Sequence, residues 1–158
     1  MGFSLSQDIT SPIPPERLFK ALVTERHVIV PKLMPNVFKS MEIVEGDGGA
    51  GTIRKATFAE GLPFKSMSQR IDILDTKNYY CKFTLFEGGM LGDTLDSIVH
   101  ELKLDPLGDG CKGKMSSHYV LKPGATINEE EVKVVKQKAY GLVKAVEEYL
   151  LSNPDVLA

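Results

Sequence analysis

Residues 45–55 read Glu-Gly-Asp-Gly-Gly-Ala-Gly-Thr-Ile-Arg-Lys, and the stretches on both sides alternate between apolar and polar residues. Such alternation predicts β-strands, here at 39–45 and 53–59. Glycine reaches positive φ without a steric penalty and lets other groups come close to the backbone. The loop is therefore either a tight connection between two strands or a cradle for an anion, built on Gly46, Gly48, Gly49 and Gly51.

One form of anion cradle, the nucleotide-binding P-loop, is excluded by the residues that follow. Gly46 and Gly51 have the separation of the outer glycines of that motif. A P-loop then requires a lysine directly after the last glycine, a serine or threonine after that lysine, and a helix whose N-terminus faces the phosphates. Here Thr52 follows Gly51 directly, and 53–58 read as a strand. We therefore predict a structural strand connection, whose N–H groups remain open to an adventitious anion.

The chain has 158 residues, the length of one domain, and we predict a single domain over 1–158. A net charge of −2 offers no basic excess that would attract nucleic acid. The N-terminus does not read as a signal peptide, and no stretch approaches the roughly 18 apolar residues that span a bilayer. The sequence predicts a soluble cytoplasmic protein, with the nucleus as a further location and without nucleic-acid or membrane partners.

The two cysteines, Cys81 and Cys111, lack the spacing of a zinc site or of a redox pair. Both are expected to be reduced. The sequence therefore predicts neither a metal site nor a cofactor.

Prolines and turn residues divide the rest of the chain into short elements. A strand at 3–10 is followed by a helix at 15–23 and by a second helix at 25–33, which has Thr24 as its N-cap and is interrupted by Pro31 and Pro35. Further strands are predicted at 39–45, 53–59, 65–74, 78–86, 95–104 and 112–121. Because 75–78 and 105–110 read as hairpin connections, the seven strands form an antiparallel sheet.

The longest periodic segment lies at the C-terminus. It begins at Asn128, a capping residue with Glu131 three positions later, and stops at 152–154, which read Ser-Asn-Pro. Apolar residues recur along it at helical spacing, so one side of this helix must lie on an apolar surface. They are Val132, Val135, Ala139, Leu142, Val143, Val146, Tyr149 and Leu150.

The alternation also assigns one face of the sheet to the interior. That inward set is Ala56, Phe58, Cys81, Phe83, Leu85, Ile98, His100, Leu102, Leu104, Met115, Ser117 and Tyr119. Small and ionisable residues in the set, together with Lys138 beside the helical stripe, favour an apolar pocket with a few polar groups. The alternative is a filled core, in which the histidine is a satisfied core residue and Lys138 extends to water.

Four stretches resemble the plant pathogenesis-related class ten proteins, the family of the major birch-pollen allergen. They are Ile13–Ala21, Glu45–Thr52, Phe86–Gly89 and Val146–Leu150, and the likeness runs over the whole chain. Shorter stretches at 21–27, 80–88 and 128–133 are most similar to a member from St John's wort. The resemblance implies an α+β helix-grip fold, in which a seven-stranded curved antiparallel sheet wraps around a long C-terminal helix. Two short helices form a V beneath a large hydrophobic cavity.

What the family resemblance implies about function is the binding, storage or transport of small hydrophobic or aromatic plant metabolites and hormones in defence. Flavonoids, phenolics and cytokinins are the ligand classes, the protein is a monomer, and a weak dimer is the alternative. The matching cavity positions are Leu22, Val23, Arg26, His27, Val30, Phe38, Phe58, Phe64, Gln69, Cys81, Phe83, Leu85, His100, Tyr119, Val135, Lys138 and Leu142.

An enzyme of specialised metabolism is a second hypothesis, because relatives of this family catalyse condensations and cyclisations. Such chemistry needs an amine or a general base in an enclosed site. Lys138 is the candidate, with Tyr119 or His100 as its acid/base partner.

Two further activities follow from the resemblance alone. Ribonuclease activity would use Lys55, Glu147 and Tyr149, with Asp96 at a position where the family carries glutamate. Abscisic-acid signalling through phosphatase inhibition is implied by 61–63, which read Gly-Leu-Pro like a receptor gate loop. The segment 86–91 lacks the matching latch, which argues against that role.

Overall fold

The computed structural model describes residues 2–62, 64–89, 91–92, 94–126 and 128–158, apart from the side chains of residues 129, 131, 132, 135 and 139. The elements follow in the order β1 (Gly2–Ser11), α1 (Pro15–Phe19), η1 (Lys20–Thr24), α2 (Arg26–Leu33), β2 (Phe38–Glu45), β3 (Ile53–Phe58), β4 (Ser66–Asp75), β5 (Tyr80–Gly88), β6 (Leu95–Leu107), β7 (Gly110–Leu121) and α3 (Glu129–Ser152). No helix in these ranges is long and apolar enough to cross a membrane.

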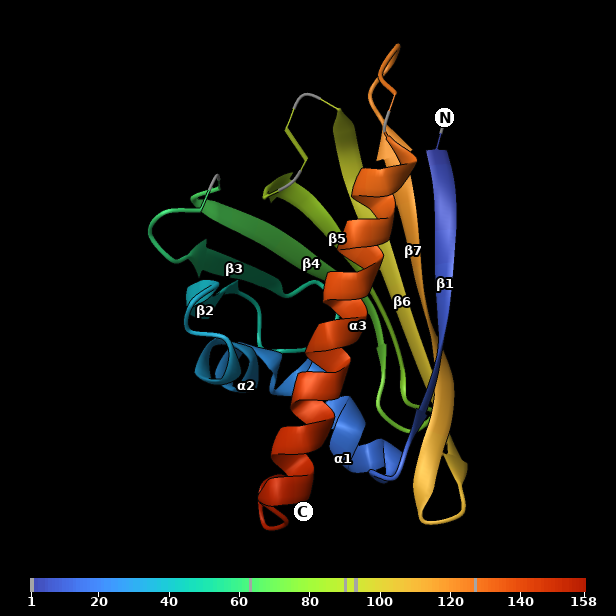
Figure 1. The fold of residues 1–158 in the computed structure, drawn as a ribbon. Coiled ribbons are helices and arrows are strands. Elements are labelled where there is room, and N and C mark those ends of the chain that lie inside the picture. Colours follow the sequence, from blue (N-terminus) through green and yellow to red (C-terminus); the bar gives the residue numbers. More distant parts are fainter. Residues whose placement is uncertain (1, 63, 90, 93, 127) are drawn as a thin grey trace.

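The strands form one antiparallel sheet in the order β1-β7-β6-β5-β4-β3-β2. β1 and β2 are its two edges, so the chain crosses from one edge to the other through α1, η1 and α2. Figure 1 shows the sheet curving around α3, with α1 and α2 at the open side of the curve. The predicted seven-stranded sheet with a long C-terminal helix is confirmed.

The helical crossover differs from the prediction in its details. The predicted helix 15–23 is α1 followed by one turn of π-helix, η1, and α2 begins at Arg26 after Glu25. Thr24 does not cap α2, because its hydroxyl turns back and donates to the Lys20 carbonyl at 3.4 Å. Pro31 does not interrupt α2 either, since it lies inside the helix, which ends at Leu33. A proline near the end of a short helix removes a single N–H donor.

The β6–β7 hairpin is also tighter than predicted. The sequence predicted a connection at 105–110, whereas Leu107 pairs directly with Gly110. Gly108 has φ +59°, a conformation that costs glycine little, and it lets two residues close the hairpin. At the other predicted turn, Asp75 accepts hydrogen bonds from the N–H groups of Lys77 and Asn78 at 3.1 and 3.2 Å.

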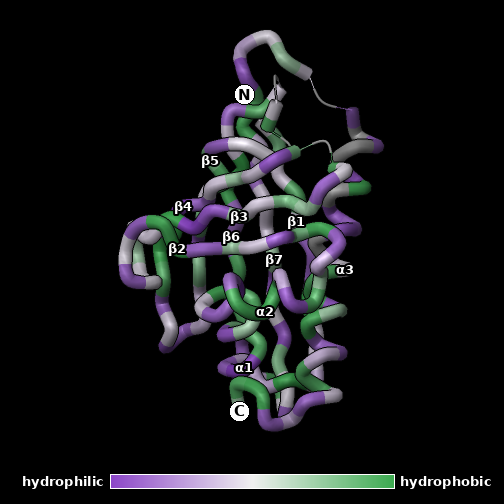
Figure 2. Tube along the Cα trace, turned by 90° about the vertical axis from the view of Figure 1, so that its left-hand side faces the viewer, coloured by the Kyte–Doolittle hydropathy of each residue, from purple (hydrophilic) through white to green (hydrophobic). Residues whose placement is uncertain are grey.

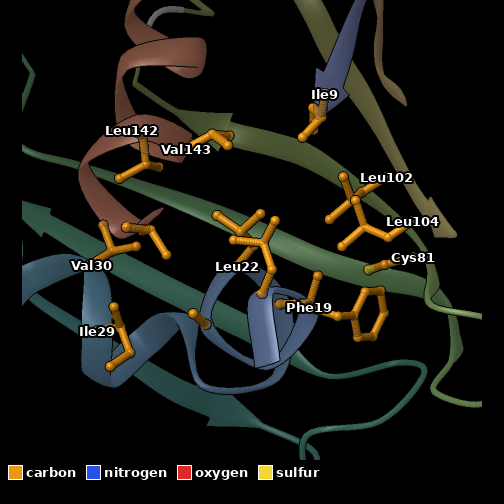
Figure 3. Packing of buried hydrophobic residues seen from close by; sticks show 14 of the residues in the cluster. Ile9, Phe19, Leu22, Ile29, Val30, Cys81, Leu102, Leu104, Leu142 and Val143 are labelled. Carbon is orange, nitrogen blue, oxygen red and sulfur yellow. The ribbon is translucent and has the colours of Figure 1, made fainter. Parts of the chain in front are cut away.

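Apolar side chains from the sheet and all the helices meet in the main core. Figure 3 shows Phe19 and Leu22, Val30 of α2 and Leu142 of α3 facing Cys81 and Leu102 of the sheet, among others. Figure 2 shows that polar residues alternate with apolar ones along most strands. We call the lower end in Figure 1, where α1, the end of α3 and the β6–β7 hairpin meet, the closed end. Five of its side chains are fully buried, namely Leu18, Leu104, Cys111, Val146 and Leu150.

Candidate ligand site between the sheet and the helices

The glycine loop uses three of its N–H groups for its own hydrogen bonds, which leaves fewer donors for an anion. The N–H of Gly48 donates to Thr52 Oγ1 at 2.9 Å, that of Gly49 to Asp47 Oδ1 at 3.0 Å, and that of Gly51 to the Ile71 carbonyl at 2.7 Å. Gly46 has φ +94°, and a Cβ there would lie 2.6 Å from Thr52 Oγ1. The predicted strand connection is confirmed, and the loop is a rigid support for β3.

Most of the predicted cavity residues lie on buried surfaces of the sheet and helices. Those that are buried are Leu22, Val23, Val30, Phe38, Gln69, Cys81, Phe83, Leu85, Tyr119 and Leu142, and those that are half-buried are Arg26, His27, Phe58, Phe64 and His100. Lys138 is exposed, and the side chain of Val135 lies outside the described part of the chain.

Two arginines converge on the C-terminal end of the π-helical turn. Arg54 of β3 is only 2% exposed, and its Nη1 donates to the Val23 carbonyl at 2.6 Å. Arg26 of α2 donates through its own Nη1 to the carbonyl of Leu22, the neighbouring residue, at 3.2 Å. The last carbonyls of a helical segment lack partners within the helix and carry partial negative charge, so cations are stabilised there.

Several polar atoms of these arginines and of the nearby Gln69 have no partner among the described residues. Nε of Arg26, Nε and Nη2 of Arg54, and Oε1 of Gln69 are buried without a hydrogen bond. Gln69 lies directly opposite Arg54 on the neighbouring strand β4 and is 5% exposed. Neither arginine forms an ion pair with a described carboxylate. We call Arg26, Arg54 and Gln69 the arginine cluster.

Burial shifts the pKa values of the arginine cluster and of the thiol beside it. Desolvation, followed by repulsion from Arg54, lowers the pKa of Arg26 to about 10. Desolvation also lowers the pKa of Arg54. The pKa of Cys81 rises to about 11 because burial outweighs the attraction of the two arginines. At neutral pH the site therefore holds two cations beside a neutral thiol.

Aromatic and imidazole rings form the adjoining wall. The guanidinium of Arg26 lies 5.8 Å from the ring centre of Phe83, and the Phe83 ring lies 5.0 Å from that of His100. His100 Nδ1 is hydrogen-bonded to Ser117 Oγ at 2.8 Å. Desolvation, with a smaller effect of Arg26, lowers the pKa of His100 to about 4, so the imidazole is neutral at pH 7.

More aromatic rings continue this wall on both sides. Tyr119 of β7 stacks on Phe3 of β1 with ring centres 4.8 Å apart, and burial raises the pKa of its hydroxyl. Towards the other edge of the sheet, Phe58 lies 5.4 Å from Phe38 and 5.7 Å from Phe64. Rings in such pairs contribute binding surface for flat apolar molecules.

The contacts of the described residues do not bring the residues predicted for catalysis together in one site. Lys55 is exposed on the outer face of β3, whereas Glu147 lies 3.5 Å from Lys144 and Tyr149 accepts a hydrogen bond from Lys32 at 2.9 Å. Asp96 is exposed as well. Of the enzyme candidates, His100 and Tyr119 share the inner face, and no described hydrogen bond joins Lys138 to either. Pro63 of the gate-like segment and Met90 of the latch segment lie outside the described residues.

Arg54 is the site residue that the sequence analysis did not assign. A signal for it exists, because Arg54 has the same parity along β3 as Ala56 and Phe58, both assigned to the inner face. A charged residue at an inward position reads as an exception to that pattern. The hydrogen bond to the Val23 carbonyl depends on how η1 crosses the sheet, which local patterns do not reveal.

Comparison with known proteins agrees with this architecture. Residues 1–153 match the model of the family described as Pathogenesis-related protein Bet v 1 family. The chain is 45% identical to Major allergen Mal d 1 of Malus domestica, over 97% of this chain and 96% of that protein. The crystal structure of Ara h 8.0201 superimposes with a TM-score of 0.88, at 36% identity over 97% of this chain and 100% of that one. Norcoclaurine synthase from Thalictrum flavum, at 24% identity and a TM-score of 0.74 over 97% and 88% of the two chains, shares the fold.

Proposed function

Because the chain belongs to the Pathogenesis-related protein Bet v 1 family, we propose that it binds small hydrophobic or aromatic molecules between the inner face of the sheet and the helices. Members of this family bind small hydrophobic ligands. In this proposal the protein stores or carries flavonoids, phenolics or cytokinins during defence. Binding of this kind uses apolar area and a few orienting polar groups, and it needs no reactive residue.

The observation that carries the proposal is that His100 and Arg26 are both desolvated and still partly exposed. Both sit deep enough for desolvation to be the main cause of their lowered pKa values. Both are nevertheless half-buried rather than buried, so part of each side chain can be reached by a small molecule. Side chains that are remote from bulk water and still accessible are the expected lining of an internal space.

The walls around these two residues suit an aromatic ligand. Phe83 and Tyr119 are buried on the same inner face as His100, and Phe58 and Phe64 continue it towards β2. Each ring offers a large apolar surface with a preferred offset or edge-on geometry for a second ring. A flat polycyclic molecule would contact several of them at once.

Titration with the neutral dye Nile red, followed by displacement with a flavonoid and a cytokinin, tests the proposal. We expect saturable dye fluorescence and competitive displacement, with dissociation constants in the micromolar range, on the order of 10⁻⁶ M. His100→Trp should fill part of the space and weaken dye binding about tenfold. The matched control is His118→Trp, because His118 is exposed on the outer face of β7. No saturable binding by the wild-type protein would refute the proposed function.

A further inference from the structure

The arginine cluster carries more positive charge and more donors than its described surroundings satisfy. Each guanidinium has five N–H donors, and the described hydrogen bonds use only Nη1 of each arginine, on the Leu22 and Val23 carbonyls. Nε of Arg26 and both Nε and Nη2 of Arg54 are buried without a partner among the described residues. Burying unpaired charge is costly, so proteins rarely keep such groups without a use.

The two arginines of the cluster are neighbours. Their Nη1 atoms bind the carbonyls of consecutive residues, Leu22 and Val23, and Arg54 is near enough for its charge to lower the pKa of Arg26. Arg26 also lies over the ring of Phe83, at 5.8 Å, on the wall where we propose that ligands bind. The free Nε and Nη2 edge of Arg54 has the fork geometry that matches the two oxygens of a carboxylate.

We propose that the arginine cluster is an anion-recognition site, which selects apolar or aromatic ligands that carry a carboxylate. Arg54 binds the carboxylate through Nε and Nη2, Arg26 adds a third donor, and the hydrocarbon part of the ligand lies along Phe83. The inference rests on the proposed function, because it names the chemical class of ligand for the same site.

The protein offers no described anion that could take this role itself. Cys81 is the group whose charge would interact with both arginines, but its raised pKa keeps the thiol protonated at neutral pH. Carboxylic acids ionise near pH 4, so a ligand acid is an anion at pH 7. Gln69 Oε1, buried opposite Arg54 without a donor, can accept a hydrogen bond from a hydroxyl group on the same ligand.

A purely structural role for the two arginines is the competing explanation. In that case the guanidinium groups only cap the carbonyls of η1, and the protein binds a negatively charged ligand no more tightly than a neutral one of the same shape. Calorimetric titration at pH 7 with 4-hydroxycinnamate and with its amide, a neutral molecule of nearly the same shape, separates the two explanations. We expect the acid to bind at least about tenfold more tightly than the amide, as a charge-assisted hydrogen-bond pair implies.

Substitutions assign that preference to residues. Arg54→Met and Arg26→Met keep a long apolar side chain and remove one cation each, so either should weaken binding of the acid more than that of the amide and reduce the preference for the acid to within about threefold. Lys114→Met, on the exposed outer face of β7, removes the same charge away from the site and should keep the preference. Two arginine variants are used so that a folding defect in one, detected by thermal unfolding, leaves the other informative.

The outcomes separate this inference from the proposed function. If the wild-type protein binds acid and amide equally, or if both arginine variants keep the preference, the anion site is wrong while ligand binding stands. If neither compound nor Nile red binds, the proposed function and the inference fail together. Equal loss of acid and amide affinity in both arginine variants, with unchanged folding, would indicate a role in shaping the space and would also overturn the anion site.

Discussion

The closed end and the arginine cluster are both buried, yet they differ in whether their polar groups have hydrogen-bond partners. At the closed end the side chains of Leu104 and Val146 are fully buried among other apolar groups. The guanidinium of Arg17 donates hydrogen bonds to carbonyls at the end of α3. In the arginine cluster, Arg54 is equally inaccessible and leaves two nitrogen atoms without a described partner. A satisfied apolar region contributes stability, whereas an unsatisfied polar one lowers it, and we propose that the cluster is maintained for ligand recognition.

The largest effect should come from opening a hole at the closed end. Leu104→Ala removes a side chain that is completely buried, and such truncations cost about 2–5 kcal/mol in unfolding free energy. Urea denaturation measures the loss. We expect the acid-over-amide preference to stay as in the wild type, because the truncation removes no polar group from the arginine cluster. A change below about 1 kcal/mol would mean that the closed end repacks.

The second prediction is a pH dependence of stability that comes from a histidine in the polar interior and not from one on the outer face. The pKa of His100 is about 4 in the folded protein, below the value of 6.5 for an unperturbed histidine. The unfolded chain therefore binds more protons between these pH values, and stability falls as pH drops from 6.5 towards 4. The loss should be up to about 3 kcal/mol and should level off below the folded pKa.

Urea midpoints between pH 7 and pH 4 measure this dependence, and a pair of substitutions assigns it. His100→Gln does not titrate and can still hydrogen-bond Ser117, so it should flatten the pH dependence in that window. His118→Gln changes an exposed histidine on the outer face of the same strand pair and should keep the slope. An unchanged slope in His100→Gln would show that another group accounts for it.

The sequence predicted the closed end better than the arginine cluster, for a physical reason. Strand alternation and the helical stripe identify apolar faces, so the burial of Val146 and Leu150 and the inward position of Leu104 follow from the periodicity. The cluster depends on one arginine meeting a carbonyl 31 positions away along the chain, across two elements. The π-helical turn that presents this carbonyl also has no local sequence signature. The family resemblance indicated Arg26 and Gln69 but not Arg54.

Arg17 should show what an arginine contributes when its donors are used. Its Nε donates to the Val156 carbonyl at 2.7 Å, and its Nη2 donates to those of Leu150 and Asn153 at 2.8 and 2.5 Å. Arg17→Met would leave these carbonyls without their charged donor and should cost about 2 kcal/mol. Thermal and urea unfolding measure the change, and hydrogen exchange at 150–157 should increase. Unaltered exchange there would show that the C-terminal segment is held by other contacts.

The smallest effect on stability is expected at Arg54, and it gives the sharpest contrast with Arg17. Arg54→Met loses one hydrogen bond, to the Val23 carbonyl, and at the same time removes a buried cation and its repulsion of Arg26. Replacing a buried, incompletely paired charge by an apolar side chain of similar length is often neutral or stabilising. We therefore expect a change within about 1 kcal/mol in urea unfolding, together with a rise in the pKa of Arg26. A loss as large as that of Arg17→Met would mean that Arg54 serves mainly to hold η1 on the sheet, and the distinction between a satisfied closed end and a recognition cluster would then disappear.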